Sequence, residues 1–157
     1  MNLFDVEPGH DEADPPGYRC GSAKLGPELG AQQLGLTVYE LAPGQSICPY
    51  HYETGEEEWL IVLLGLATLR TPEGEQELSP WDCTFFPAGE DGAHEVMNRT
   101  DEAVRVCIWS NRLAVATAIY PDSEKLGAWP PGRLFRLGDA VDYYDGESPS
   151  GEPPIGS

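Results

Sequence analysis

The chain has 157 residues, a length typical of one domain, and its 27 acidic residues against 9 basic ones give a net charge of −18. Such a negative surface argues against nucleic acid or an anionic membrane as a partner, because both attract basic proteins. The 18 glycines and 15 prolines indicate many turns, which favours an all-β architecture over a helical bundle.

The first 33 residues are rich in proline and glycine and weakly patterned, so we expect an N-terminal arm over residues 1–33. This segment has neither the basic region nor the apolar region of a secretory signal. The longest apolar run is too short to span a membrane, and we therefore expect a cytoplasmic protein with no membrane partner. The four cysteines form no Cys-x-x-Cys pair and are expected to be reduced.

From Leu34 onward, short apolar or alternating segments are separated by turn residues. The expected strands lie at 34–41, 58–64, 66–71, 76–78, 83–86, 93–98, 103–110 and 113–120. Short strands recurring in this way are typical of a sandwich or barrel, so we assign residues 34–120 to a β-barrel. The run EWLIVLL at 58–64 reads as a strand buried on both faces.

After Pro121 the pattern is irregular, and we expect a C-terminal extension over residues 121–157. One compact piece stands at 132–147. The last ten residues, 148–157, have the composition of a disordered tail.

The residues that carry chemistry stand around the run at 58–64. Glu58 opens this apolar strand, and a buried carboxylate is costly unless it is paired or binds a metal. Residues i and i+2 of a strand share a face, so His51 and Glu53 point the same way if their segment is extended. A second histidine, His94, stands in a distant strand. Two imidazoles and one carboxylate form a ligand set suited to Fe(II) or Mn(II), whereas the alternative is a solvated turn beside structural histidines.

The order of these residues resembles the cupin superfamily. The segment Gly44–Gly65, with His51, Glu53 and Glu58, looks like the first cupin motif, and Pro87–Asn98, with His94, is similar to the second. The resemblance implies an all-β fold, the double-stranded β-helix or jelly-roll barrel. The sequence departs from the family pattern at Glu53, which stands in place of the second histidine of His-x-His. Gly92 also lengthens the second motif, and Trp81 stands where that motif begins with glycine.

This resemblance implies a divalent metal ion (Fe, Mn, Zn or Ni) with His51, Glu58 and His94 as ligands and Glu53 in the place of the fourth. Glu53 has three interpretations: a metal ligand, a general base for catalysis, or a solvated turn residue. Its neighbours Glu56 and Glu57 are expected to face water. Asn98 is expected to be a structural residue at a turn or strand end.

The function that these residues favour is that of a small metal-dependent enzyme, a dioxygenase, decarboxylase or isomerase acting on a small molecule. Two alternatives stay open: a barrel that binds or senses a sugar or another small molecule without turnover, and a metal-free structural barrel. Open coordination positions on the ion would favour the enzyme over the binding barrel, and the metal content of the protein would separate the metal-free barrel from both. Edge strands and extended terminal arms lead us to expect a homodimer.

Overall fold

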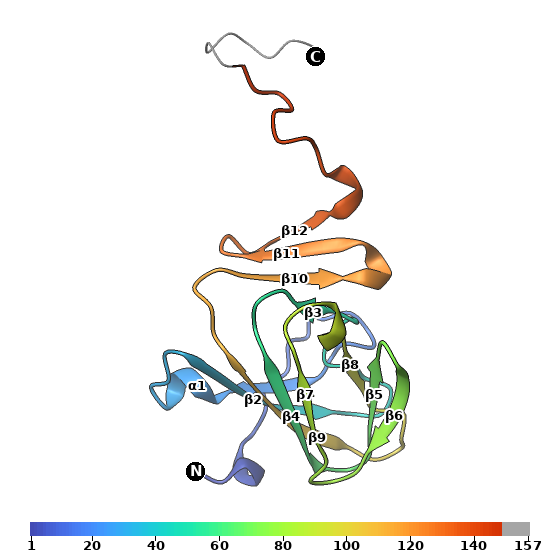
Figure 1. The fold of residues 1–157 in the computed structure, drawn as a ribbon. Helices are drawn as coiled ribbons and strands as arrows, with labels where there is room; N and C mark the ends of the chain where they lie inside the picture. Colours follow the sequence, from blue (N-terminus) through green and yellow to red (C-terminus); the bar gives the residue numbers. More distant parts are fainter. Residues whose placement is uncertain (149–157) are drawn as a thin grey trace.

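The computed structural model describes residues 1–148, and these residues fold into an all-β jelly-roll barrel of antiparallel strands (Figure 1). The fold class expected from the sequence is confirmed. The expected disordered tail lies outside the described residues from position 149 onward.

The largest sheet has five strands and forms one wall of the barrel. In spatial order its strands are β1 (Gly21–Lys24), β2 (Leu34–Leu41), β9 (Val104–Asn111), β4 (Glu58–Leu64) and β7 (Cys83–Phe86). A three-stranded sheet contains β6 (Gly74–Leu78), β5 (Ala67–Thr71) and β8 (Glu95–Met97). Alternate residues of both sheets point inward, so the two walls bury a common core.

A four-stranded sheet lies across one end of the barrel in Figure 1. Its strands are β12 (Arg133–Arg136), β11 (Lys125–Trp129), β10 (Ala116–Tyr120) and β3 (Tyr52–Glu53). Because β3 belongs to the first motif and β10 leads into the C-terminal extension, this sheet joins that extension to the segment that carries Glu53. The expectation of irregular structure from Pro121 onward is therefore wrong for residues 125–129 and 133–136, which form β11 and β12.

The helical elements are short. They are α1 (Leu25–Glu28) and the 3-10 turns η1 (Leu3–Asp5), η2 (Glu90–Gly92), η3 (Pro121–Ser123) and η4 (Leu137–Asp139). No helix within residues 1–148 has the length and apolar character needed to cross a membrane.

The main core lies between the two barrel walls and consists of aliphatic side chains with one aromatic ring. Its buried members include Leu41, Leu60, Val62, Leu69, Phe86, Val96, Val104 and Val106. A second cluster lies on the outer face of the large sheet, where Leu25 of α1 packs with Val38, Leu63 and Cys107. The N-terminal region thus covers the outside of its own sheet, and residues 21–24 extend that sheet as β1.

Strand β4 was expected to be buried on both faces, and the structure corrects this. Leu60 and Val62 point into the core and are fully buried, whereas Trp59 on the opposite face is 42% exposed. Trp59 packs against Phe85 and Trp109 on the outside of the sheet. The alternation predicted from strand parity is confirmed, and Glu58 falls on the inner face with Leu60.

Candidate metal centre

The two motif histidines are direct partners in an isolated antiparallel bridge, in which His51 immediately precedes β3 and His94 immediately precedes β8. The amide N–H of His51 donates to the carbonyl of His94 (3.1 Å), and that of His94 donates to the carbonyl of His51 (2.8 Å). Both side chains therefore leave the backbone on the same side, with 4.9 Å between their ring centroids. The distant strands meet here as the motif spacing predicted.

The tautomer of each histidine follows from its second hydrogen bond. Nδ1 of His51 lies 3.0 Å from the carbonyl of Pro49, and Nδ1 of His94 lies 2.9 Å from the carbonyl of Gly92. A carbonyl only accepts, so Nδ1 is the protonated nitrogen in both rings and donates. Each neutral imidazole then presents the lone pair of Nε2 to the interior, which is how metal-binding histidines are commonly oriented.

Burial keeps these imidazoles neutral. It lowers the pKa of His51, and burial together with the neighbouring His51 lowers the pKa of His94 to about 4. His94 is also held between its backbone bridge and Phe86, whose ring stacks on it. The third histidine of the sequence, His10, is exposed in the N-terminal region.

Two carboxylates face the Nε2 atoms at distances that no hydrogen bond accounts for. Glu58 Oε2 lies 3.5 Å from His94 Nε2, and Glu53 Oε1 lies 3.8 Å from His51 Nε2. Lone pairs thus oppose one another, an arrangement that is unfavourable unless a cation or a proton lies between them. Glu53 Oε2 is the buried side-chain oxygen without a hydrogen-bond partner among the described residues.

Burial raises the pKa of both carboxyls. Glu58 is shifted to about 7 by burial and then by the charge of Glu56, and Glu53 is shifted to about 7 by burial and then by the charges of Glu58 and Glu56. A divalent cation removes this penalty, because it stabilises the ionised form. The donor set, two neutral imidazoles and at least one acidic oxygen, fits such an ion.

One ligand atom each from His51, Glu58 and His94 lies within 4.8 Å of the other two, so these residues could hold a metal ion. Glu53 is not part of this three-residue group in the described part of the chain. It lies beside the group on β3, where it pairs with Ala118 of β10. The structure places Glu53 next to His51 and leaves its ligand role as a prediction.

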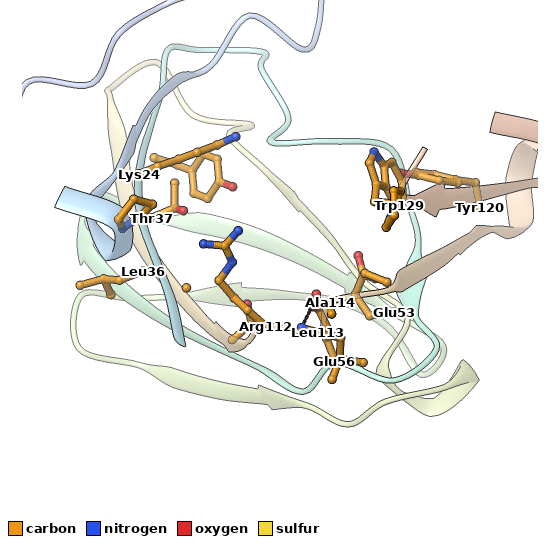
Figure 2. A pocket seen from close by; sticks show the side chains of 16 residues that line it. Lys24, Leu36, Thr37, Glu53, Glu56, Arg112, Leu113, Ala114, Tyr120 and Trp129 are labelled. Atoms are coloured by element: carbon orange, nitrogen blue, oxygen red, sulfur yellow. Dashed lines mark hydrogen bonds between the residues drawn. The ribbon is translucent and has the colours of Figure 1, made fainter. Parts of the chain in front are cut away.

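Two cavities adjoin these residues. A small one of about 60 Å³ is lined by His51, Glu58 and His94 together with Tyr39 and Cys48. A larger one of about 820 Å³ includes Glu53 and Tyr120 in its lining, and Tyr39 borders both cavities (Figure 2). Glu53 therefore faces the open mouth, while Glu58 lies deeper.

Glu57 is exposed, as expected, whereas Glu56 is only partly exposed to water. Glu56 is half-buried and its Oε1 accepts the backbone N–H of Leu113 (2.7 Å). Asn98 is structural as expected. It is 1% exposed, and its Nδ2 donates to the carbonyls of Leu41 and Glu102.

Sequence reasoning missed several aromatic neighbours of the site. The ring of Tyr120 stacks on His51 with 5.6 Å between centroids, and Phe86 stacks on His94. Phe86 could have been found by register, because it pairs with Glu58 across β4 and β7 and so shares its face. Tyr120 had no such signal, since it belongs to a strand whose pairing with β3 is long-range.

Comparison with known proteins agrees with this geometry. Residues 37–111 match the Cupin_2 family, described as a cupin domain. A search of curated protein sequences finds no match. Among solved structures, a sugar phosphate isomerase of the cupin superfamily from Silicibacter pomeroyi is 26% identical, with a TM-score of 0.78, and the alignment covers 92% of this chain and 97% of that chain.

Two further structures share the fold. A provisionally named sugar phosphate isomerase from Acidithiobacillus ferrooxidans is 24% identical with a TM-score of 0.79, covering 89% of this chain and 91% of that chain. A polyketide cyclase from Streptomyces resistomycificus is 24% identical with a TM-score of 0.58, covering 71% of this chain and 77% of that chain. Residues 37–111 thus match a cupin domain, and the barrel has the fold of cupin structures.

Proposed function

We propose that this protein is a metal-dependent isomerase that moves a proton between neighbouring carbons of a small carbonyl compound. The observation that carries the proposal is the convergence of three ligand atoms, one each from His51, His94 and Glu58, within 4.8 Å of one another, with Nε2 of both imidazoles free of the Nδ1 proton. Such a set favours a divalent cation, and the adjoining cavity leaves room for a substrate.

In this proposal His51, His94 and Glu58 hold the ion. When bound, the ion supplies Lewis acidity that polarises an oxygen of the substrate. The carbonyls of Pro49 and Gly92 keep both imidazoles in the tautomer that binds a metal. Phe86 and Tyr120 hold the two rings by stacking on them.

Glu53 is the proposed general base. Its carboxyl faces the larger cavity, has one oxygen without a partner and has a pKa raised to about 7 by burial. A base with a pKa near the working pH can both accept and return a proton. Glu53 would take a proton from the hydroxyl-bearing carbon beside the carbonyl and deliver it to the carbonyl carbon. The hydroxyl proton would pass to the former carbonyl oxygen, so the substrate is rearranged without gaining or losing an atom.

Two observations favour isomerisation over dioxygenation or decarboxylation. Glu53 is a carboxyl suited to reversible proton transfer, and that chemistry needs no second substrate. The relative from Silicibacter pomeroyi, which covers almost the whole chain, is named a sugar phosphate isomerase. Together these observations support proton transfer on a polyhydroxylated carbonyl compound.

The test begins with the metal content of the purified, untagged protein. We expect about one ion per chain in wild type, loss of the ion in His94→Ala, and retention in His10→Ala, the matched histidine outside the site. If the wild type stays metal-free after anaerobic reconstitution with Fe(II), Mn(II), Zn(II) and Ni(II), the proposal is overturned.

The second step measures proton transfer directly. Aldose and ketose phosphates are incubated in D₂O and deuterium at the carbon next to the carbonyl is followed by NMR. Glu53→Gln is expected to retain the metal and to lose exchange by about 10²-fold or more. Exchange that survives in Glu53→Gln would remove Glu53 from the role of base, and metal binding with no exchange in wild type would identify a binding protein instead.

A further inference from the structure

The larger cavity is lined by charged residues of both signs. It occupies about 820 Å³ at the open end of the barrel, and its lining includes two basic residues, Lys24 and Arg112, as well as Glu53 and Glu56. In Figure 2 the ammonium of Lys24 and the guanidinium of Arg112 point into the cavity from one side, and Glu53, Tyr120 and Trp129 lie across from them. The cavity is therefore basic at one side and borders the metal centre at the other.

Strand register explains why both cations face this cavity. Glu58 is paired with Ser110, and Ser110 is paired with Gly35 of β2. Arg112 follows two residues after Ser110 and so continues on the same face of the sheet as Glu58. Lys24 is paired with Thr37, which stands two residues after Gly35 on that face. The inner face of the sheet thus runs from the carboxylate of Glu58 to two basic side chains at its edge.

The backbone at Arg112 is held firmly. Its N–H donates to the carbonyl of Gln33 (2.7 Å), and the next residue, Leu113, donates to Glu56 Oε1 (2.7 Å). The side-chain stem passes beside Gly35, where a Cβ atom would lie 3.7 Å from Arg112 Cγ. Glu56 is engaged by the backbone of Leu113, and no ion pair joins it to Arg112 within residues 1–148.

The two cavity cations lack the carboxylate partners that three other arginines of the chain have. Arg70 is paired with Asp122, Arg99 with Glu75 and Arg105 with Glu40. For Lys24 and Arg112, no side-chain ion pair or hydrogen bond occurs anywhere in the described part of the chain. In a protein of net charge −18, most of the surface repels an anion, so two unpaired cations facing one cavity form a local exception.

We propose that Arg112 and Lys24 bind an oxyanion group, a phosphate or a carboxylate, on a small molecule whose other end reaches the metal centre. Arg112 offers a planar fork of N–H donors that matches such a group, and Lys24 adds a second charge. Both residues are exposed, so a small molecule can reach them without rearrangement of the fold. That this molecule is the substrate rests on the proposed function, whereas the oxyanion site itself does not.

The test compares three probes by isothermal titration calorimetry: fructose 6-phosphate, gluconate and neutral fructose. In wild type, at least one charged probe is expected to bind about 10-fold or more tightly than fructose, and the preferred one identifies the oxyanion as phosphate or carboxylate. Arg112→Gln and Lys24→Gln are each expected to lose that preference by about 10-fold. Arg133→Gln, which removes an exposed arginine outside the cavity, is the matched control and is expected to bind as wild type does.

Equal binding of fructose and both charged probes would overturn the proposal, as would unchanged preference in Arg112→Gln and Lys24→Gln. Melting temperatures of the variants confirm that each is folded. The same titrations with His94→Ala separate this proposal from the proposed function. If His94→Ala still prefers the charged probe, the oxyanion site is supported even if the protein holds no metal. If the wild type binds metal and exchanges protons but shows no preference for a charged probe, the oxyanion site alone is refuted.

Discussion

Phe86 lies almost parallel to His94, with 3.8 Å between ring centroids and 9° between ring planes. The pair forms because Phe86, the last residue of β7, lies on the face shared with Glu58, while His94 is held there by its bridge with His51. A buried aromatic ring therefore sets the plane of an imidazole that we propose to be a ligand.

Phe86→Leu is expected to weaken metal binding by about 10-fold, because groups that orient a metal-binding histidine typically affect affinity to this degree. The measurement is the dissociation constant from competition with a chromophoric chelator. Phe85→Leu is the control, since Phe85 is 40% exposed and contacts Trp59 on the outer face of the sheet. If both variants lose affinity equally, the loss reflects general destabilisation and the stacking argument is wrong.

The raised pKa of Glu58, about 7 because of burial and then Glu56, predicts how the metal-free protein responds to pH. The folded state keeps a proton that the unfolded state releases above its ordinary pKa of 4.5, so folding stability falls as pH rises from about 4.5 to 7. Glu58→Gln lacks this proton. We expect metal-free wild type to lose stability relative to Glu58→Gln across this range, on the order of 3 kcal/mol at most.

Urea unfolding in the presence of a chelator, at pH 5 and pH 7.5, measures this difference. Glu57→Gln serves as the control because Glu57 is exposed on the same turn. A constant difference between wild type and Glu58→Gln at both pH values would contradict the raised pKa. Saturation with the metal should abolish the wild-type loss, because the ion stabilises the ionised carboxylate.

Asn98 is expected to support the fold and not the reaction. Its buried amide donates to two carbonyls, and its Oδ1 accepts from the N–H and hydroxyl of Thr100. Asn98→Ala leaves these groups unsatisfied in the interior and is expected to lower the free energy of unfolding by about 3 kcal/mol. Chemical denaturation measures the loss. The folded variant should still bind metal with wild-type stoichiometry, and a loss of metal without a loss of stability would assign Asn98 to the site.

Gly92 is expected to be irreplaceable even by alanine. A Cβ atom at this position would lie within 2 Å of the carbonyl oxygen of Pro87, and the carbonyl of Gly92 accepts the Nδ1 proton of His94. Gly92→Ala must therefore displace the loop that orients His94, and we expect both a lower melting temperature and weaker metal binding. Gly138→Ala is the control, because no atom lies within 4 Å of the corresponding Cβ. A wild-type metal affinity in Gly92→Ala would show that His94 does not need this acceptor.

The thiols should differ sharply in reactivity. Cys83 is exposed, whereas burial raises the pKa of Cys20 and Cys48 and raises that of Cys107 to about 11. At pH 8 we expect iodoacetamide to label Cys83 rapidly in the native protein and the other three only after denaturation, as measured by intact mass. Cys83→Ser should abolish the rapid labelling, and rapid labelling of Cys48 would mean that the metal cavity opens more than the structure indicates.

Local patterns predicted the barrel strands and three residues of the site. Alternation placed Glu58 with Leu60 and Val62 on one face, and motif spacing brought His51 and His94 together. These inferences depend on neighbours close in sequence or on a pattern shared by a family. Strand β1 and the hairpin of β11 and β12 were not predicted, because these short segments contain glycine or charged residues and show no clear alternation of apolar and polar residues. The exposure of Trp59 depends on what covers the outer face of the sheet, and residue patterns alone do not report that.

Lys24 and Arg112 show the same limit at the level of function. Neither belongs to a motif, and each stands in a segment that reads as a loop or an arm. Only the pairing of β1 with β2 and of β2 with β9 brings their side chains to one face. Local sequence patterns therefore do not predict that these two charged side chains lie on the same face of the sheet.

The pairing of β3 with β10 makes the segment after Asn111 a structural part of the site. A chain cut there would keep His51, Glu58 and His94, but it would strip Glu53 of its backbone partner Ala118 and His51 of the ring of Tyr120. The barrel would lose one wall of its mouth and leave the edge of β3 open to solvent. The hairpin of β10 and β11 is thus part of the catalytic architecture that we propose. Exchanging this hairpin between related barrels offers a way to change substrate choice while the proposed metal ligands stay the same.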